Sequence, residues 1–281
     1  MTFIYLALTI FFWGTGQTLL KIGFSKSTPI SSFFIGGLAG IFVAAPYIIF
    51  YERPVFDNYH LFLPIMLAVA LCYLTYYYAL NAGELSVASA ILGTYPMYTV
   101  LFAVIVMKEV LVLKQCIGLF LVIGGVGALS VSSGGTDTDG VKGQGISRVW
   151  IFLSIISAVL IGVADAVSKV VLDHTNPATY FLYFGVIQII LGFVLKLAFE
   201  GGNFDLTALR SKYSIIGMFL LNCGGMAFTF ALKSNQASIV VPLSSTYLAL
   251  VTLLSWWFLK EKFTFAKGFG IAAIIAGVML L

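Results

Sequence analysis

Charged side chains are scarce in this sequence. Lys, Arg, Asp and Glu together make up 9% of its 281 residues, whereas apolar residues make up 60%. A typical soluble domain has about 25% charged residues, and no water-soluble fold of this length could hide so much apolar surface. The shortage of charge therefore excludes an ordinary soluble protein and predicts an outer surface that contacts lipid.

Histidine and cysteine are also rare. The two histidines, His60 and His174, lie far apart in sequence, with no His-Glu-x-x-His motif or cluster of carboxylates. The three cysteines, Cys72, Cys116 and Cys223, lie inside apolar runs without metal-like spacing, and we interpret them as small buried hydrophobic residues. We therefore expect no metal site, no cofactor and no catalytic centre.

The basic residues form no stripe. The net charge is +4, but Lys and Arg are scattered singly between apolar runs, so a nucleic-acid partner is not expected. A Walker A phosphate loop is absent from the sequence. Any transport would therefore draw on a gradient of solute, proton or sodium.

Long apolar runs are what the sequence has in abundance. A helix needs about 20 such residues to cross a bilayer, and continuous runs favour helices over a β-barrel. Ten runs lie at roughly 3–24, 31–51, 61–80, 85–107, 114–131, 149–171, 178–199, 213–233, 237–259 and 265–281. We predict an all-α integral membrane protein with ten transmembrane helices.

An internal repeat relates the two halves. The stretch Gly93 to Val110, GTYPMYTVLFAVIVMKEV, aligns with Ser245 to Lys262, STYLALVTLLSWWFLKEK, at an offset of 245 − 93 = 152. Over positions 79 to 126 this offset gives twelve identities. We interpret the Thr-Tyr pairs as candidates for a cavity wall, and the Lys-Glu pairs as the places where the two helices leave the bilayer.

A weaker match relates the first run to the sixth, at an offset of 148, with Gly14 opposite Gly162 and Lys21 opposite Lys169. Residues 132–148 are rich in Gly, Ser and Asp and are interpreted as a flexible linker. We predict one five-helix repeat over residues 1–131 and a second over residues 149–281, joined by this linker.

The predicted count of five helices in each repeat has a consequence for topology. An odd number of crossings inserts the second repeat upside down, with a pseudo-two-fold axis in the membrane plane. Two similar units of opposite orientation have two nearly equivalent packings, one open to each side. This arrangement favours a transporter that works by alternating access.

Three features resemble the drug/metabolite transporter superfamily, in its ten-helix EamA-type branch: the pattern FFWGTGQTLLK, the paired Tyr-to-Lys-Glu phrases and the glycine-rich fifth and tenth runs. The resemblance implies an exporter in the cytoplasmic membrane of a bacterium or archaeon. The first run is also similar to that of the small multidrug resistance proteins, which carry a carboxylate eight positions before the residue matching Lys21. Trp13 stands there, so that carboxylate cannot be carried over.

Polar side chains inside the apolar runs mark the expected solute site, because such groups are costly to bury in lipid. Candidate cavity residues are Trp13, Gln17, Tyr73, Tyr77, Thr94, Tyr95, Asp165, Asn222, Ser245 and Tyr247. Pro96 and Pro242 interrupt the fourth and ninth runs, and broken helices line the site in inverted-repeat transporters. The alternative for Trp13, Gln17 and many of the hydroxyl groups is packing within or between helices.

Asp165 is the main candidate for ion coupling. It could bind a cationic group or take up a proton, or it could be neutralised by Lys169 four residues later on the same helix face. Lys21 and Lys169 are candidates for binding an anionic group, as in the phosphate-carrying branches of the resembling family. Alternatively, each extends from the end of its run toward the lipid headgroups.

Glycines at seven-residue intervals give the fifth and tenth runs a smooth face: Gly118, Gly125, Gly270 and Gly277. We expect this face to pack helix against helix, within one chain or between the protomers of a homodimer, and to make no solute contact. Both a monomer and a homodimer therefore stay open.

The sequence predicts a secondary transporter of a small organic solute, such as an amino acid, an amine or a drug-like metabolite. Its other partners would be membrane lipid and a coupling proton or sodium ion. The alternatives are a flippase of a lipid-linked carrier and a membrane-embedded lipid-modifying enzyme. Five basic residues fall on the side of the N-terminus and ten on the other, so the positive-inside rule places both termini outside, whereas the resemblance places them in the cytoplasm.

Overall fold

The computed structural model describes residues 2–23, 28–57, 59–82, 92–133, 149–199, 211–258 and 264–280. The regular secondary structure in these ranges is helical throughout: α1 (Thr2–Gly23), α2 (Pro29–Phe50), α3 (Tyr59–Ala82), α5 (Tyr95–Ile105), α6 (Leu113–Ser133), α7 (Val149–His174), α8 (Pro177–Phe199), α10 (Lys212–Ser234), α11 (Ala237–Ser245), α12 (Tyr247–Phe258) and α13 (Phe265–Val278). Each of the ten predicted runs overlaps at least one of these helices. Residues 134–148 of the predicted linker lie outside the described ranges, so the domain limits stay a prediction.

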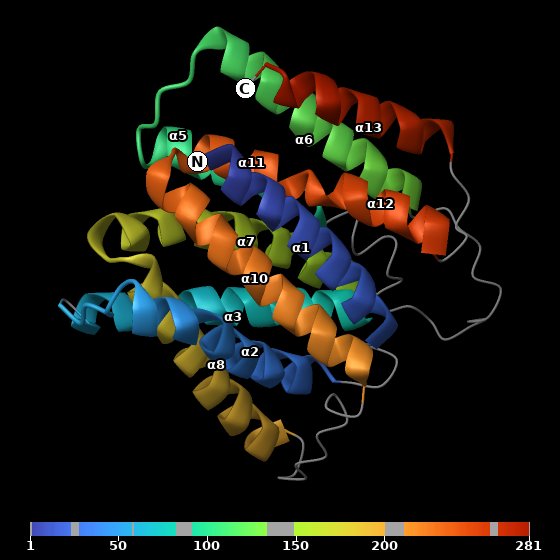
Figure 1. Ribbon diagram of the computed structural model, residues 1–281. Helices are drawn as coiled ribbons and strands as arrows, with labels where there is room; N and C mark the ends of the chain where they lie inside the picture. The colour runs from blue at the N-terminus through green and yellow to red at the C-terminus, as the bar shows by residue number, and fades with distance from the viewer. Residues whose placement is uncertain are drawn as a thin grey trace.

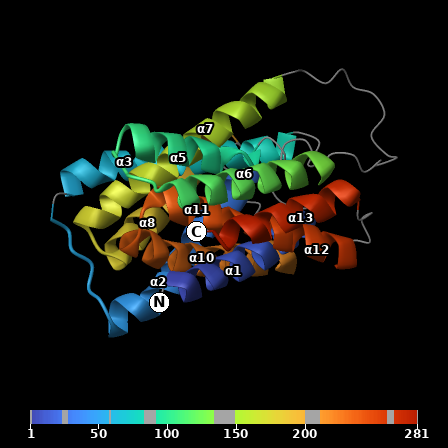
Figure 2. The same cartoon turned by 90° about the horizontal axis from the view of Figure 1, so that it is seen from above.

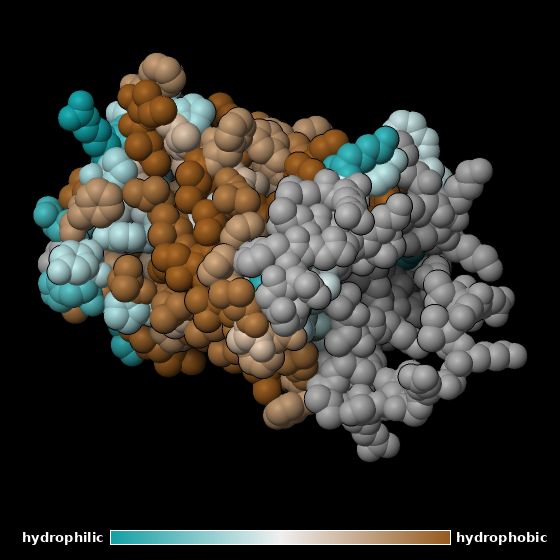
Figure 3. All heavy atoms as spheres, turned by 90° about the horizontal axis from the view of Figure 1, so that it is seen from below, coloured by the Kyte–Doolittle hydropathy of each residue, from teal (hydrophilic) through white to brown (hydrophobic). Residues whose placement is uncertain are grey.

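The described helices include seven segments that are long and apolar enough to cross a membrane. They are α1, α2, α3, α7, α8, α10 and the stretch Ala237–Leu254, which joins α11 to most of α12. Large apolar side chains point outward from them and from the shorter helices: Phe42 is 71% exposed and Phe120 is 78% exposed. Figure 3 shows such side chains as a broad brown band beside a more polar end. A surface of this kind fits a lipid environment, and the chain is a multi-pass integral membrane protein.

Local sequence sets where several helices begin. Thr28, Ser211 and Thr264 directly precede α2, α10 and α13, and each side chain accepts a hydrogen bond from the backbone N–H three residues later. These bonds satisfy backbone donors that a helix leaves free at its start, which stabilises each helix by about 1 kcal/mol.

Helix packing follows a pseudo-two-fold relation between the halves. Two helices pack against their own counterparts, α2 against α8 and α6 against α13, and the latter pair lies side by side in Figures 1 and 2. Other contacts come in equivalent pairs. Helix α1 packs on α10 as α7 packs on α3, and α1 packs on α12 as α7 packs on α5. The repeat in the sequence is therefore also a repeat in the packing.

The direction of the counterpart helices indicates that the second half is inverted. A Cβ atom added to Gly125 would lie 2.7 Å from the carbonyl oxygen of Gly270, and one added to Gly277 would lie 2.6 Å from that of Gly118. As residue numbers rise along α6 they fall along α13, so these helices run antiparallel. The predicted glycine face thus packs α6 against α13 within one chain.

The fourth and ninth spans break at the Thr-Tyr pairs of the repeated phrase. Helix α5 begins at Tyr95, directly after Thr94, and α12 begins at Tyr247, directly after Thr246, the residue that follows α11. A proline lies within four residues of each break and removes a backbone donor there. Tyr95 and Tyr247 are both only 7% exposed, so both breaks lie in the interior.

Candidate functional site

A small cavity lies where the two broken spans meet α1 and α3. It is lined by Gln17, Tyr76, Leu92, Gly93, Tyr95, Tyr247 and Leu248. Its volume is about 230 Å³, which includes space open to the surroundings, and its enclosed part has room for about one water molecule. The wall therefore combines residues of both halves, and three of the predicted site residues, Gln17, Tyr95 and Tyr247, contribute to it.

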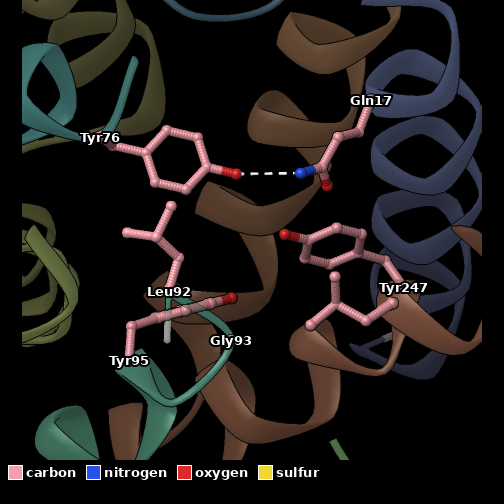
Figure 4. A pocket seen from close by; sticks show the side chains of 7 residues that line it. Gln17, Tyr76, Leu92, Gly93, Tyr95 and Tyr247 are labelled. Carbon is pink, nitrogen blue, oxygen red and sulfur yellow. Dashed lines mark hydrogen bonds between the residues drawn. The ribbon is translucent and has the colours of Figure 1, made fainter. Parts of the chain in front are cut away.

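An amide and three phenol groups supply the polarity of this cavity. The Gln17 Nε2 donates a hydrogen bond of 3.0 Å to the Tyr76 hydroxyl, drawn as a dashed line in Figure 4. The hydroxyl of Tyr247 lies beside that of Tyr76, and the hydroxyl of Tyr95 lies beside that of Ser244 on α11. Amide and phenol groups both donate and accept hydrogen bonds, and aromatic rings attract cations. The chemistry of this wall therefore suits a polar or cationic organic group.

Trp13 lies behind this wall. Its indole N–H donates a hydrogen bond of 3.1 Å to the carbonyl oxygen of Leu221 on α10, and its ring meets that of Tyr247 edge-on at a centroid separation of 5.6 Å. A Cβ atom at Gly224 would collide with the indole, so the glycine makes room for it. Of the two interpretations of Trp13, the structure favours packing, with the indole holding Tyr247 in place.

Asp165 is buried on α7, with only 2% of its surface exposed. It accepts a hydrogen bond of 2.7 Å from the hydroxyl of Tyr73, which lies one turn before Tyr76 on α3. Lys169 forms an ion pair of 2.7 Å with Asp173, so it is not the partner that neutralises Asp165. The carboxylate is therefore held by a phenol in the membrane interior.

A second hydroxyl pair lies near this carboxylate. The oxygens of Tyr180 on α8 and Ser168 on α7 are 2.8 Å apart, and Tyr180 is close enough to Asp165 for an electrostatic interaction. The ring of Phe184 stacks on Tyr180 and meets Tyr73 edge-on. A buried carboxylate among hydroxyl groups can bind a proton or a small cation, which fits the predicted coupling role.

Three other predicted residues, Tyr77, Asn222 and Ser245, do not line the cavity. The Tyr77 hydroxyl contacts the sulfur of Met218 at 3.7 Å. The Asn222 amide donates a bond of 3.1 Å to the carbonyl of Gly36, which ties α10 to α2. The Ser245 hydroxyl bonds to the carbonyl of Pro242 in its own helix, at 2.7 Å. In the described structure these three side chains therefore make contacts within or between helices, and their part in binding a solute stays a prediction.

The other two candidates lie near helix ends. Thr94 is half buried at the start of α5, between the cavity residues Gly93 and Tyr95. Lys21 lies in α1, but its side chain is outside the described part of the structure. Its role in binding an anionic group therefore stays a prediction, as does that of Lys169.

The sequence prediction passed over Tyr76, which lines the cavity. It included Tyr73 and Tyr77, which are four positions apart and share one helix face. Tyr73 and Tyr76, three positions apart, share a face equally well. The available signal was Gln17, because an amide in hydrocarbon needs a partner and a neighbouring tyrosine hydroxyl provides one.

Comparison with known proteins identifies relatives for the whole chain. The sequence profile of the EamA-like transporter family matches residues 1–131 and residues 148–281. An uncharacterized protein of Methanocaldococcus jannaschii is 36% identical over 132 residues, which are 47% of this chain and 94% of that protein. An uncharacterized transporter of Archaeoglobus fulgidus is 28% identical over 210 residues, which are 74% of this chain and 70% of that protein.

Two further similarities are more limited. A probable 4-amino-4-deoxy-L-arabinose-phosphoundecaprenol flippase subunit, ArnE, of Aeromonas hydrophila is 33% identical over 73 residues, which are 26% of this chain and 64% of that protein. A solved crystal structure has a TM-score of 0.73 over 99% of this chain and 96% of that chain, with 16% sequence identity. This structural similarity concerns the fold alone.

Proposed function

Because the chain belongs to the EamA-like transporter family, we propose that it is a secondary transporter that moves a small organic solute across the membrane by alternating access. The main support is the cavity between the halves, where Gln17 and Tyr76 of the first half meet Tyr247 of the second. In an inverted repeat, a site in this position can face either side when the halves rock against each other.

The wall of the cavity suggests the class of solute. The described residues that line it carry amide, phenol and apolar groups and no formal charge. A phenol-rich wall suits an amine or an amino acid that also has an apolar part. Since the enclosed part of the cavity has space for about one water molecule, its wall must widen to admit such a solute.

Asp165 would couple transport to a proton or a sodium ion. Tyr73, which binds this carboxylate, and Tyr76, which binds Gln17, are one turn apart on α3. A movement of α3 would therefore change the surroundings of ion and solute together. Export remains the direction that the family resemblance implies, and solute uptake into everted vesicles would test it.

A thermal-shift screen of the purified protein tests the proposal directly. Amino acids, amines, nucleosides and sugar phosphates are added separately, and a binding solute raises the apparent unfolding temperature because it stabilises the folded state. We expect an amine or amino acid to do so in the wild type and to do so less in Tyr76→Phe. If no soluble compound shifts the transition while lipids do, the solute-transporter proposal fails.

The second candidate function is a flippase for a lipid-linked carrier. The observation that favours it is the similarity of 73 residues to the flippase subunit of Aeromonas hydrophila. A polyprenyl phosphate in mixed micelles is the probe for this candidate. Stabilisation by the polyprenyl phosphate, but not by a plain phospholipid of equal charge, would support the flippase over the solute transporter.

A further inference from the structure

Glu109 ends the repeated phrase in the first half, but its side chain binds the second half. Its carboxylate accepts hydrogen bonds from the backbone N–H groups of Ala237, at 2.9 Å, and Ser238, at 3.0 Å, and from the Ser238 hydroxyl. These are the first N–H groups of α11, and Gln236, the residue before this helix, provides no side-chain cap. Glu109 therefore caps a helix of the opposite repeat. We call Glu109, Ala237 and Ser238 the Glu109 clamp.

The backbone before Glu109 is shaped for this contact. Lys108 has a φ of 58°, in the left-handed region that residues other than glycine rarely adopt. The Glu109 N–H then donates a bond of 3.1 Å to the carbonyl of Ala103 in α5. The chain thus reverses at Lys108 and presents the carboxylate to α11. Such conformations persist where surrounding contacts determine them, and they cluster at functional sites.

The clamp joins the two broken spans on one side of the membrane. Helix α11 packs on α5, and the two spans supply Tyr95 and Tyr247 to the cavity. Other contacts between the halves lie near helix ends on the same side. The Asn176 side chain donates to the carbonyl of Arg53 at 2.9 Å, and the Thr179 hydroxyl accepts from the N–H of Val55 at 2.7 Å. Several contacts between the halves therefore gather on this side.

We propose that the Glu109 clamp holds the halves together on this side, and that it must open before the cavity can face that side. This inference rests on the alternating-access function proposed above. A carboxylate at a helix N-terminus is favoured by the N–H groups and by the helix dipole, so the charge of Glu109 supplies much of the contact. Glu109 is a positioning residue, since it acts on the cavity through α11 rather than by touching the solute.

Distance measurements between spin labels test the clamp without a solute. Val112 and Ser234 are exposed on the same side, one in each half, and would be labelled in the full-length protein, in lipid nanodiscs, after replacement of the native cysteines. Glu109→Gln keeps the size but removes the charge. Because it weakens charge-assisted bonds, it should raise the ratio of a longer distance population to the short one by about tenfold.

Two matched variants make this result specific. Glu52 lies on the same side, and its carboxylate accepts a bond of 2.8 Å from Tyr47 within the first half, so Glu52→Gln should leave the distances unchanged. Glu109→Asp keeps the charge and should restore most of the short population. The proposal is overturned if Glu109→Gln matches the wild type, if Glu52→Gln shifts the distances equally, or if Glu109→Asp behaves like Glu109→Gln.

A further variant covers the case in which Glu109→Gln does not fold. Ser238→Ala removes one of the three donors and should shift the distances the same way by a smaller factor, whereas an unchanged distribution would again overturn the clamp. The outcome is separable from that of the proposed function. If Glu109→Gln shifts the distances but no solute stabilises the protein in the thermal-shift screen, the clamp is supported and solute transport is not. If a solute stabilises the protein but Glu109→Gln leaves the distances unchanged, solute transport is supported and the clamp is not.

Discussion

Gln17 and Asp165 stand at equivalent positions in the two halves, because 165 − 17 = 148, the offset that also pairs Gly14 with Gly162. Each is hydrogen-bonded to a tyrosine of α3, Gln17 to Tyr76 and Asp165 to Tyr73. The amide borders the cavity, whereas the carboxylate is buried beside it on α7. Equivalent positions have thus acquired different chemistry.

The reason for the difference lies in α3 and its counterpart α10. At the offset of 152, Tyr73 corresponds to Gly225 and Tyr76 to Phe228. The first half therefore provides the phenols for both polar partners, and the second half provides none at these positions. A symmetric packing of helices can thus support the asymmetric site that we propose, with solute and ion at separate but neighbouring places.

Removing the buried charge should have the largest effect on this comparison. Asp165→Asn makes the two equivalent positions both amides, and a proton or sodium gradient can then no longer act through the carboxylate. We expect gradient-driven transport in proteoliposomes to fall by about a hundredfold or more, while downhill exchange of solute continues. Asp173→Asn on the same helix, at the partly exposed ion pair with Lys169, is the control and should keep the gradient response. Full gradient-driven transport by Asp165→Asn would remove this residue from the mechanism.

Substitutions at the glycine contact between α6 and α13 test whether equivalent glycines of the two halves contribute equally to stability. Gly125→Ala should lower the free energy of unfolding by about 1–3 kcal/mol, because the new Cβ atom meets the carbonyl of Gly270. Gly277→Ala should cost a similar amount. Gly124→Ala is the matched control, since a Cβ atom there meets nothing within 4 Å. Unfolding in detergent, followed by circular dichroism, gives the three values, and a Gly277→Ala that behaves like Gly124→Ala would contradict the two-fold contact.

Removing single hydroxyl groups from α3 should separate the two roles. Tyr76→Phe loses a bond to Gln17 and should weaken solute binding by about tenfold with an unchanged response to the ion gradient. Tyr73→Phe loses the bond to Asp165 and should alter the pH or sodium dependence with nearly unchanged solute affinity. Titration of solute binding at several pH values and sodium concentrations measures both effects. If the two variants behaved identically, solute and ion would share a single site.

The smallest expected effect concerns the second copy of the Lys-Glu pair. Glu261 is the sequence equivalent of Glu109 and lies outside the described residues, so this expectation rests on the repeat alone. If the halves exchange roles during transport, Glu261→Gln should modestly lower the longer distance population between labels at Val112 and Ser234. A rise like that expected for Glu109→Gln would show that the two glutamates are not functional counterparts.

Much of the architecture was predictable because it depends on composition and spacing. Apolar runs located the spans, and the repeated Thr-Tyr pairs coincide with the breaks before Tyr95 and Tyr247. The cavity was harder to predict. Sequence spacing does not fix how far α3 is rotated about its axis, and this rotation brings Tyr76, rather than Tyr77, to the cavity. The same limit applies to Asn222, whose amide donates a hydrogen bond to the carbonyl of Gly36 on α2.

The role of Glu109 was hidden for a different reason. A Lys-Glu pair after an apolar run is typical of the membrane interface, so the sequence supported only the interpretation that a helix ends there. The left-handed conformation of Lys108 becomes visible only in three dimensions, as do the bonds from the first N–H groups of α11, 128 and 129 residues after Glu109. Long-range capping of this kind leaves no local sequence signal.

The antiparallel contact of α6 with α13, in which glycines of one helix meet the repeat-equivalent glycines of the other, has a consequence for ancestry. Two separate copies of a five-helix chain, inserted in opposite directions, could make the same contact with each other. In such an assembly every substitution would appear in both copies. A carboxylate could therefore not be gained at one position without also appearing at the equivalent position of the other copy. Duplication and fusion into one polypeptide would have lifted that restriction and allowed Gln17 and Asp165 to diverge.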